Sequence, residues 1–200
     1  MIISLKCKNC KGNLLGEADE FLFLCKECNS TYLLTDNGMK PISTFQIVDD
    51  EKYQILLPMY LFDISIDYKL FSTKRQEVVA QAIGNSIRMV VRGFSMIDPV
   101  YFGDIELETI SRVNNREINL DRLTPKEKNF KLNIRPDVAN RLLDYNFMRY
   151  FDRRADITGL KYNYEIADTN ILFLKAMLNN GTILLSDLKK ELPSCAFLSI

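Results

Sequence analysis

The alternation of hydrophobic and polar residues predicts strands over most of the chain. Its clearest instance runs from Phe62 to Leu70, where an apolar residue stands at every second position and Asp, Ser or Lys stands between. A period of two residues is that of a strand with one buried face. Shorter apolar stretches bounded by turn residues predict further strands at 21–24, 31–34, 42–48, 87–94, 105–110 and 117–120.

Helical spacing is clearest at residues 136–152. Pro136 suits the first turn of a helix, and apolar residues recur every three to four positions from Val138 to Met148. Three other segments are less regular: we expect a short helix at 73–83, a helix or a buried strand at 167–178, and a short last helix at 186–192. The whole pattern predicts an α+β protein with mainly antiparallel strands and a few helices.

Four cysteines near the N-terminus have the spacing of a metal site. Cys7 and Cys10 form one C-x-x-C pair, and Cys25 and Cys28 form a second pair after fourteen intervening residues. Two such pairs are typical of one structural Zn²⁺ ion held tetrahedrally by four thiolates, which leaves no open position for water. Iron would take the same ligands, and a redox dithiol is a third interpretation, although redox motifs normally contain a single pair.

The cysteine spacing divides the chain into two predicted units. We expect residues 1–40 to form a zinc ribbon, with two metal-binding turns on a small three-stranded sheet, and residues 41–200 to form the α+β body. Turn residues at 35–41 predict a short linker between them. Because about forty residues bury little surface, the metal should supply folding free energy. Its removal is therefore expected to unfold residues 1–40 and to leave the body folded.

Composition excludes several classes of catalyst. The chain is 47% hydrophobic and 26% charged, has a formal net charge of zero and contains no histidine. Without histidine there is no imidazole base, relay or metal ligand, and no P-loop, dinucleotide-binding or G-x-S-x-G motif occurs. The longest apolar run, at 55–62, is too short to cross a bilayer and contains Pro58, and no apolar leader precedes Cys7. We therefore expect a cytoplasmic protein without enzymatic activity, in which the remaining cysteine, Cys195, is a buried inert thiol.

A carboxylate-rich stretch is the one candidate for acid–base or magnesium chemistry. On the strand predicted at 105–110, Glu106 and Glu108 would share a face, which suits paired carboxylates. The solvated face of an edge strand explains the same pattern. Asp98 and Asp104 complete the stretch.

Charge is unevenly distributed along the chain. Residues 1–40 hold five lysines and five acids, which argues against nucleic-acid binding by the ribbon. Residues 41–110 carry six basic and ten acidic side chains, whereas residues 111–154 carry eleven basic and six acidic ones. The two body segments would complement each other across one fold or between copies; alternatively, the basic stretch at 112–154 binds RNA, phosphate or an acidic partner.

The residues around the cysteines resemble the zinc ribbon of the small methyltransferase-activator proteins. In that family the ribbon is a structural zinc module that engages a protein partner, which implies the same role for Cys7, Cys10, Cys25 and Cys28. Lys8 stands where the family has Pro, and the family's helical insert is not recognisable in residues 42–200, so the partner class does not carry over. The matching positions are Leu5, Cys7, Cys10-Lys11-Gly12, Leu14, Leu24-Cys25, Cys28, Tyr32, Asp36, Gly38 and Pro41.

The whole chain more loosely resembles bacterial proteins of uncharacterised function that begin with a zinc ribbon, through Leu57-Pro-Met-Tyr60, Arg92-Gly-Phe94 and Gly103–Leu107. This likeness implies an architecture and no activity. The sequence thus favours a non-enzymatic interaction protein, an adaptor or assembly component with a protein partner or a homo-oligomeric state. The alternative is a nucleic-acid-binding factor that uses the basic stretch at 112–154.

Overall fold

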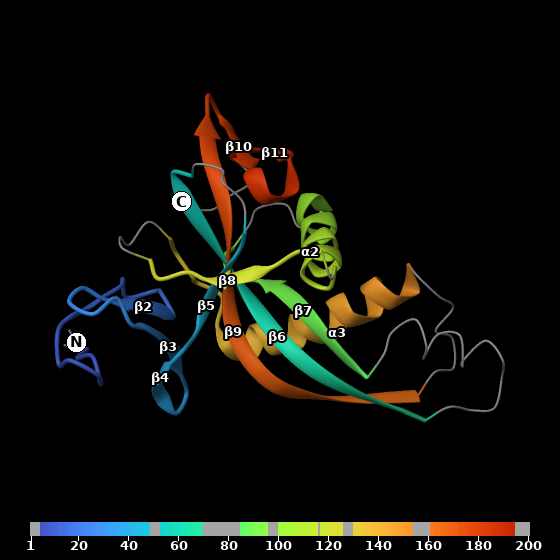
Figure 1. Cartoon of the computed structure of the whole chain (residues 1–200), viewed down its shortest axis with the longest axis horizontal. Coiled ribbons are helices and arrows are strands. Elements are labelled where there is room, and N and C mark those ends of the chain that lie inside the picture. Colours follow the sequence, from blue (N-terminus) through green and yellow to red (C-terminus); the bar gives the residue numbers. More distant parts are fainter. Residues whose placement is uncertain are drawn as a thin grey trace.

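Two sheets and two helices make up the described part of the computed structural model (Figure 1), which confirms the predicted α+β class with mainly antiparallel strands. The structure describes residues 5–48, 53–69, 85–95, 100–115, 117–125, 130–153 and 161–194. The helix predicted at 73–83 and Cys195 lie outside these residues.

The N-terminal sheet contains β1 (Leu14–Leu15), β2 (Leu22–Cys25), β3 (Thr31–Thr35) and β4 (Gly38–Pro41), in this order and all antiparallel. It has four strands where three were expected, because the predicted linker forms the β3–β4 hairpin. Gly38 has a φ of 95°, which a residue with a side chain rarely adopts.

The larger sheet is built on β9 (Lys161–Asn179), so the segment at 167–178 is a strand. One edge of β9 pairs along most of its length with antiparallel β6 (Ile55–Lys69), which in turn pairs with β7 (Ser86–Arg92). The other edge is shared by parallel β5 (Thr44–Ile47) and antiparallel β10 (Thr182–Leu185). Two short strands, β8 (Leu120–Arg122) and β11 (Lys190–Pro193), extend the sheet at its ends.

Two helices pack against β7 and against each other. The helix predicted at 136–152 is confirmed as α3 (Pro136–Asp152). The strand predicted at 105–110 is wrong, because these residues lie within helix α2 (Val100–Val113). The last predicted helix is reduced to a 3-10 turn, η1 (Ser186–Leu188), before β11.

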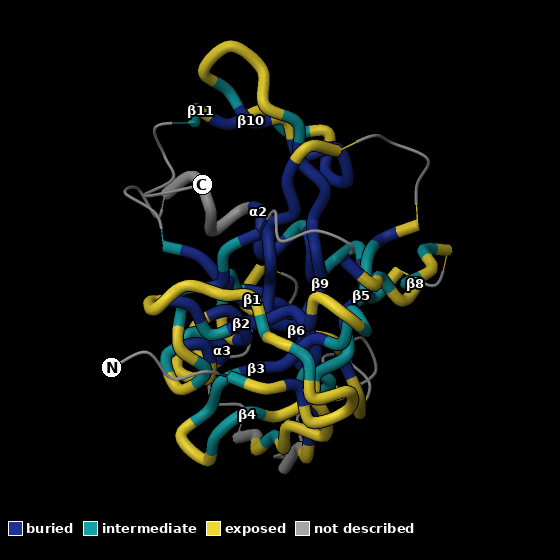
Figure 2. Tube along the Cα trace, turned by 90° about the vertical axis from the view of Figure 1, so that its left-hand side faces the viewer, coloured by how far each residue is buried: buried dark blue, intermediate teal, exposed yellow. Residues whose placement is uncertain are grey.

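A continuous core joins the N-terminal sheet to the body. Leu22, Leu24 and Leu33 belong to the same buried cluster as the side chains of β6 and β9. The backbone N–H of Phe21 also donates to the carbonyl of Leu132 at 2.8 Å. Figure 2 shows the buried stretch of β6 and β9 beside the N-terminal strands. Since a buried leucine contributes about 1.5–3 kcal/mol, the three leucines link the stability of the two units.

Candidate metal centre

Two turns of the same geometry position the four cysteines. In the first, the N–H of Cys7 donates to Gly12 O at 2.9 Å and the N–H of Lys11 donates to Cys7 O at 3.0 Å. In the second, the N–H of Cys25 donates to Ser30 O and the N–H of Asn29 donates to Cys25 O, both at 2.9 Å. The fourth residue after the leading cysteine is left-handed in each turn, with φ values of 65° at Lys11 and 55° at Asn29.

Asparagine often adopts this conformation at turns, so Asn29 carries a local sign of it. A lysine gives no local sign of positive φ, although its position equivalent to Asn29 would have predicted it. At Gly12, a Cβ would lie 2.0 Å from Oε2 of Glu27 in the opposite turn, so a larger residue would require this exposed side chain to move.

The four predicted metal-binding sulfurs lie together between these turns. Each lies within 4.8 Å of the others, with 3.6 Å between Cys7 and Cys28 and 3.4 Å between Cys10 and Cys25. A tetrahedral zinc site with Zn–S bonds of about 2.3 Å has sulfurs about 3.8 Å apart. The cluster is therefore close enough to bind one metal ion.

Hydrogen bonds around the sulfurs favour their ionised form unequally. Burial opposes ionisation of Cys7, but hydrogen bonds from the Tyr32 hydroxyl and two backbone N–H groups outweigh it and lower the pKa of this thiol to about 6. Burial raises the pKa of the Cys25 thiol to about 12. The Ser30 hydroxyl lies 3.1 Å from the Cys28 sulfur and lowers the pKa of that thiol. Because a bound cation deprotonates coordinating thiols, metal binding would release a proton from Cys25 at neutral pH.

Most charges of the ribbon separate onto two sides, which its neutral composition did not predict; the exception is the exposed Glu27, which lies in the second metal-binding turn. Lys131 of the body lies 3.2 Å from the carboxylate of Glu17 and 3.1 Å from that of Asp19. Arg135 lies 3.2 Å from Asp36. On the metal-binding turns, by contrast, four exposed lysines form no ion pair with the described residues: Lys6, Lys8, Lys11 and Lys26.

The candidate carboxylate pair does not exist in the structure. Because α2 is a helix, Glu106 and Glu108 point in different directions. Glu106 is 3% exposed and accepts the backbone N–H of Arg92, whereas Glu108 pairs with Lys190 at 2.6 Å. Asp98 lies outside the described residues, and the side chain of Asp104 is not described either.

Several cations of the basic stretch at 112–154 are engaged within the protein. Lys131 and Arg135 contact the ribbon, and Arg141 lies 3.5 Å from Asp137 of its own helix. Arg149 stacks over Tyr145, with its guanidinium carbon 5.2 Å from the ring centre. These contacts leave fewer free cations than the sequence suggested. Lys131 meets acids of the ribbon, and Arg135 meets both Asp36 of the ribbon and, at 2.9 Å, Asp137 of its own segment, so neither cation pairs with the described part of residues 41–110.

Comparison with family models, with curated proteins and with solved structures finds no match to this chain. In the described residues, neither helix is long and apolar enough to span a bilayer.

Proposed function

We propose that this chain is a non-enzymatic cytoplasmic interaction protein whose zinc ribbon docks onto a protein partner. The separation of charge on the ribbon is the observation that carries this proposal. The acids Glu17, Asp19 and Asp36 face the body, whereas the exposed lysines surround the metal-binding turns. The four lysines exceed the charge of Glu27 and the two negative charges of a zinc ion held by four thiolates, and the small positive excess favours a partner with an acidic surface.

We assign the metal as one structural Zn²⁺ ion. Four sulfur ligands at tetrahedral spacing suit zinc, and the chain has no histidine to form a mixed site. The thiols must stay reduced to bind a metal, which supports a cytoplasmic location.

Metal analysis of the purified protein tests this assignment. We expect about one zinc per chain, a loss of bound zinc in Cys7→Ser and unchanged zinc in the control Cys195→Ser. Stoichiometric iron with its visible absorption would overturn the choice of zinc. Equal metal content in both variants would overturn the site.

We define the docking surface as the knuckle face, formed by Lys6, Lys8, Lys11 and Lys26. The nucleic-acid alternative at 112–154 is less well supported, because Lys131, Arg135 and Arg141 already form surface ion pairs with carboxylates of the same chain. Phosphate backbones require basic side chains that are free to contact them.

Capture of binding partners by the intact zinc-loaded protein tests the docking surface. The test variant is Lys8→Glu with Lys11→Glu and Lys26→Glu. The matched control reverses three other exposed cations, Lys40→Glu, Arg122→Glu and Arg141→Glu, so both proteins change charge equally. We expect a defined protein to bind the wild type and the control, resist nuclease treatment and be lost from the test variant. Nuclease-sensitive binding would favour the nucleic-acid alternative, and equal binding to all three proteins would overturn the docking surface.

Size measurement by light scattering of the same three proteins separates a second copy of the chain from another partner. A dimer of the wild type that dissociates in the test variant would make the partner a second copy. A monomer in all three proteins leaves the captured protein as the partner.

A further inference from the structure

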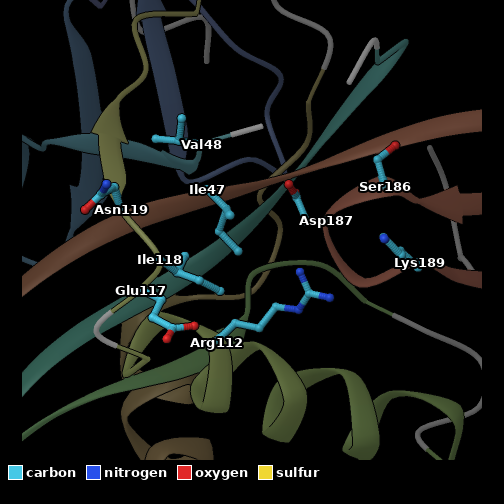
Figure 3. Close-up of a pocket in the computed structure, with 9 residues that line it drawn as sticks. All are labelled: Ile47, Val48, Arg112, Glu117, Ile118, Asn119, Ser186, Asp187 and Lys189. Atoms are coloured by element: carbon cyan, nitrogen blue, oxygen red, sulfur yellow. The ribbon is translucent and has the colours of Figure 1, made fainter. Parts of the chain in front are cut away.

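A cavity of about 260 Å³ lies in the body where four chain segments meet. The segments are the end of β5, the end of α2, residues 117–119, and η1 with Lys189 directly after it, and Figure 3 shows the residues around the space between them. The lining residues are Ile47, Val48, Arg112, Glu117, Ile118, Asn119, Ser186, Asp187 and Lys189.

Two cations reach this cavity from opposite walls. Arg112 belongs to the last turn of α2, and its guanidinium enters the space between Ile118 and the turn that carries Asp187 (Figure 3). Lys189 is held in the facing wall by a left-handed backbone with a φ of 54°. Neither cation forms an ion pair with any described residue, although the neighbouring Lys190 does. Two like charges facing one space without a carboxylate at contact distance favour an anion between them.

The acids of the cavity do not neutralise these cations directly. Asp187 is 2% exposed, its Oδ2 accepts the backbone N–H of Lys175 at 2.6 Å, and no ion pair joins its carboxylate to Arg112 or Lys189. Glu117 is exposed and forms no ion pair with Arg112, although Figure 3 shows it beside the base of that side chain. Among the described residues, the N–H groups of Arg112 and Lys189 therefore exceed the carboxylate oxygens that pair with them.

One side of the cavity is apolar. Ile47 is 4% exposed and Ile118 is half-buried, whereas Val48 at the mouth is 49% exposed. Small-molecule sites combine such apolar walls with a few charged groups that fix orientation. The volume equals that of about nine waters at about 30 Å³ each, which suits a molecule smaller than a nucleotide.

We propose that this cavity binds a small organic anion, whose carboxylate or phosphate group lies between Arg112 and Lys189 and whose short apolar part contacts Ile47 and Ile118. Arg112 supplies the paired N–H groups that match two oxygens of such a group. The site is separate from the cysteines and does not depend on the proposed docking function.

Titration calorimetry on the full zinc-loaded chain tests this site with butyrate, butyl phosphate, inorganic phosphate and butylamine as probes. We expect at least one of the two butyl anions to bind with a Kd in the millimolar range or below. Butyrate binding without butyl phosphate binding would assign a carboxylate ligand, and the reverse a phosphate ligand. Butylamine should not bind.

Two surface substitutions separate the site from non-specific attraction. Arg112→Gln and Lys189→Gln should each weaken binding of the butyl anion at least about tenfold, which corresponds to about 1.4 kcal/mol. The control Arg141→Gln removes the same charge from α3 and should leave the Kd unchanged. Ile118→Ala should weaken the butyl anion more than inorganic phosphate. All variants are checked for unchanged melting temperature before titration.

Three results would overturn the proposal. The first is no binding of either butyl anion at about 10 mM, well above the millimolar Kd expected. The second is equal binding to wild type, Arg112→Gln and Lys189→Gln. The third is binding of butylamine in preference to the anions, which would show that Glu117 and Asp187 dominate the cavity.

Discussion

Glu106 accepts the backbone N–H of Arg92 at 2.8 Å and so covers part of the outer edge of β7. Two asparagines, Asn114 directly after α2 and Asn146 in α3, bind further backbone groups of that edge. The Asn114 amide both accepts from Arg88 N and donates to Arg88 O, at 2.9 and 2.7 Å, and Asn146 donates to Val90 O at 3.0 Å. Side chains of α2 and α3 thus take the place of a neighbouring strand, which protects the edge from pairing with another chain.

Glu106→Gln should make the protein more stable at neutral pH, or leave its stability unchanged, because the amide oxygen can still accept the Arg92 N–H. Burial raises the pKa of Glu106, while the Arg92 N–H and the charges of Arg92 and Arg149 partly oppose the rise. The folded state therefore binds the proton more tightly than the unfolded state, whose pKa is about 4.3. It follows that the contribution of Glu106 to the free energy of unfolding increases as the pH falls from the pKa of Glu106 in the folded state to its pKa in the unfolded state.

Urea unfolding between pH 4 and pH 8 measures this difference. The advantage of Glu106→Gln over the wild type should shrink as pH is lowered through that window. Glu106→Ala, which leaves the Arg92 N–H without its acceptor, should lose about 1–3 kcal/mol at any of these pH values. A Glu106→Gln protein that loses stability mainly at neutral pH would contradict the explanation.

Tyr32→Phe should weaken zinc binding about 10- to 100-fold while leaving the fold intact. The buried Tyr32 hydroxyl lies 3.2 Å from the Cys7 sulfur and stabilises its thiolate. Loss of such a contact outside the ligand shell typically has this effect on metal affinity. Competition with a coloured chelator measures the affinity, and Tyr53→Phe, at an exposed tyrosine, is the control.

Chelation of the metal should expose the amides of the metal-binding turns first and also lower the melting temperature of the body. The second effect follows from the shared core, in which Leu22, Leu24 and Leu33 pack with β6 and β9. Hydrogen exchange with and without chelator measures both effects. An unchanged melting temperature of the body would instead support residues 1–40 as an independently stabilised unit.

Gly93→Ala should destabilise the protein by more than the roughly 1 kcal/mol expected for Gly181→Ala. A Cβ at Gly93 would lie 2.6 Å from the backbone oxygen of Pro58, where the Gly93 N–H donates to that oxygen at 3.0 Å. Gly181 has open space around it and costs only the strain of its φ of 88°. Thermal unfolding of the two variants compares these costs, and equal losses would contradict the role of the close contact.

Several features could be predicted from the sequence because they depend on neighbours along the chain. The alternation from Phe62 onward identified a strand, and the spacing from Val138 to Met148 identified α3. The two cysteine pairs predicted the sulfur cluster, since each pair belongs to a single local turn. The stretch at 105–110 was misjudged because its six residues fit both periods. Ile105, Thr109 and Val113 are the helical series that a longer window would have shown.

The charge pattern of the ribbon and the roles of its neighbours were decided only by tertiary structure. Five lysines and five acids cancel in the sequence, but Lys131 and Arg135 approach the acidic side and leave the lysines of the knuckle face exposed. Likewise, the fold places Glu106 against the edge of β7, where it accepts the N–H of Arg92. The fold also places Arg112 and Lys189, which are far apart in the sequence, around one cavity. Such contacts join segments far apart in the chain, and local periodicity carries no information about which distant side chains the packing of sheets and helices brings together.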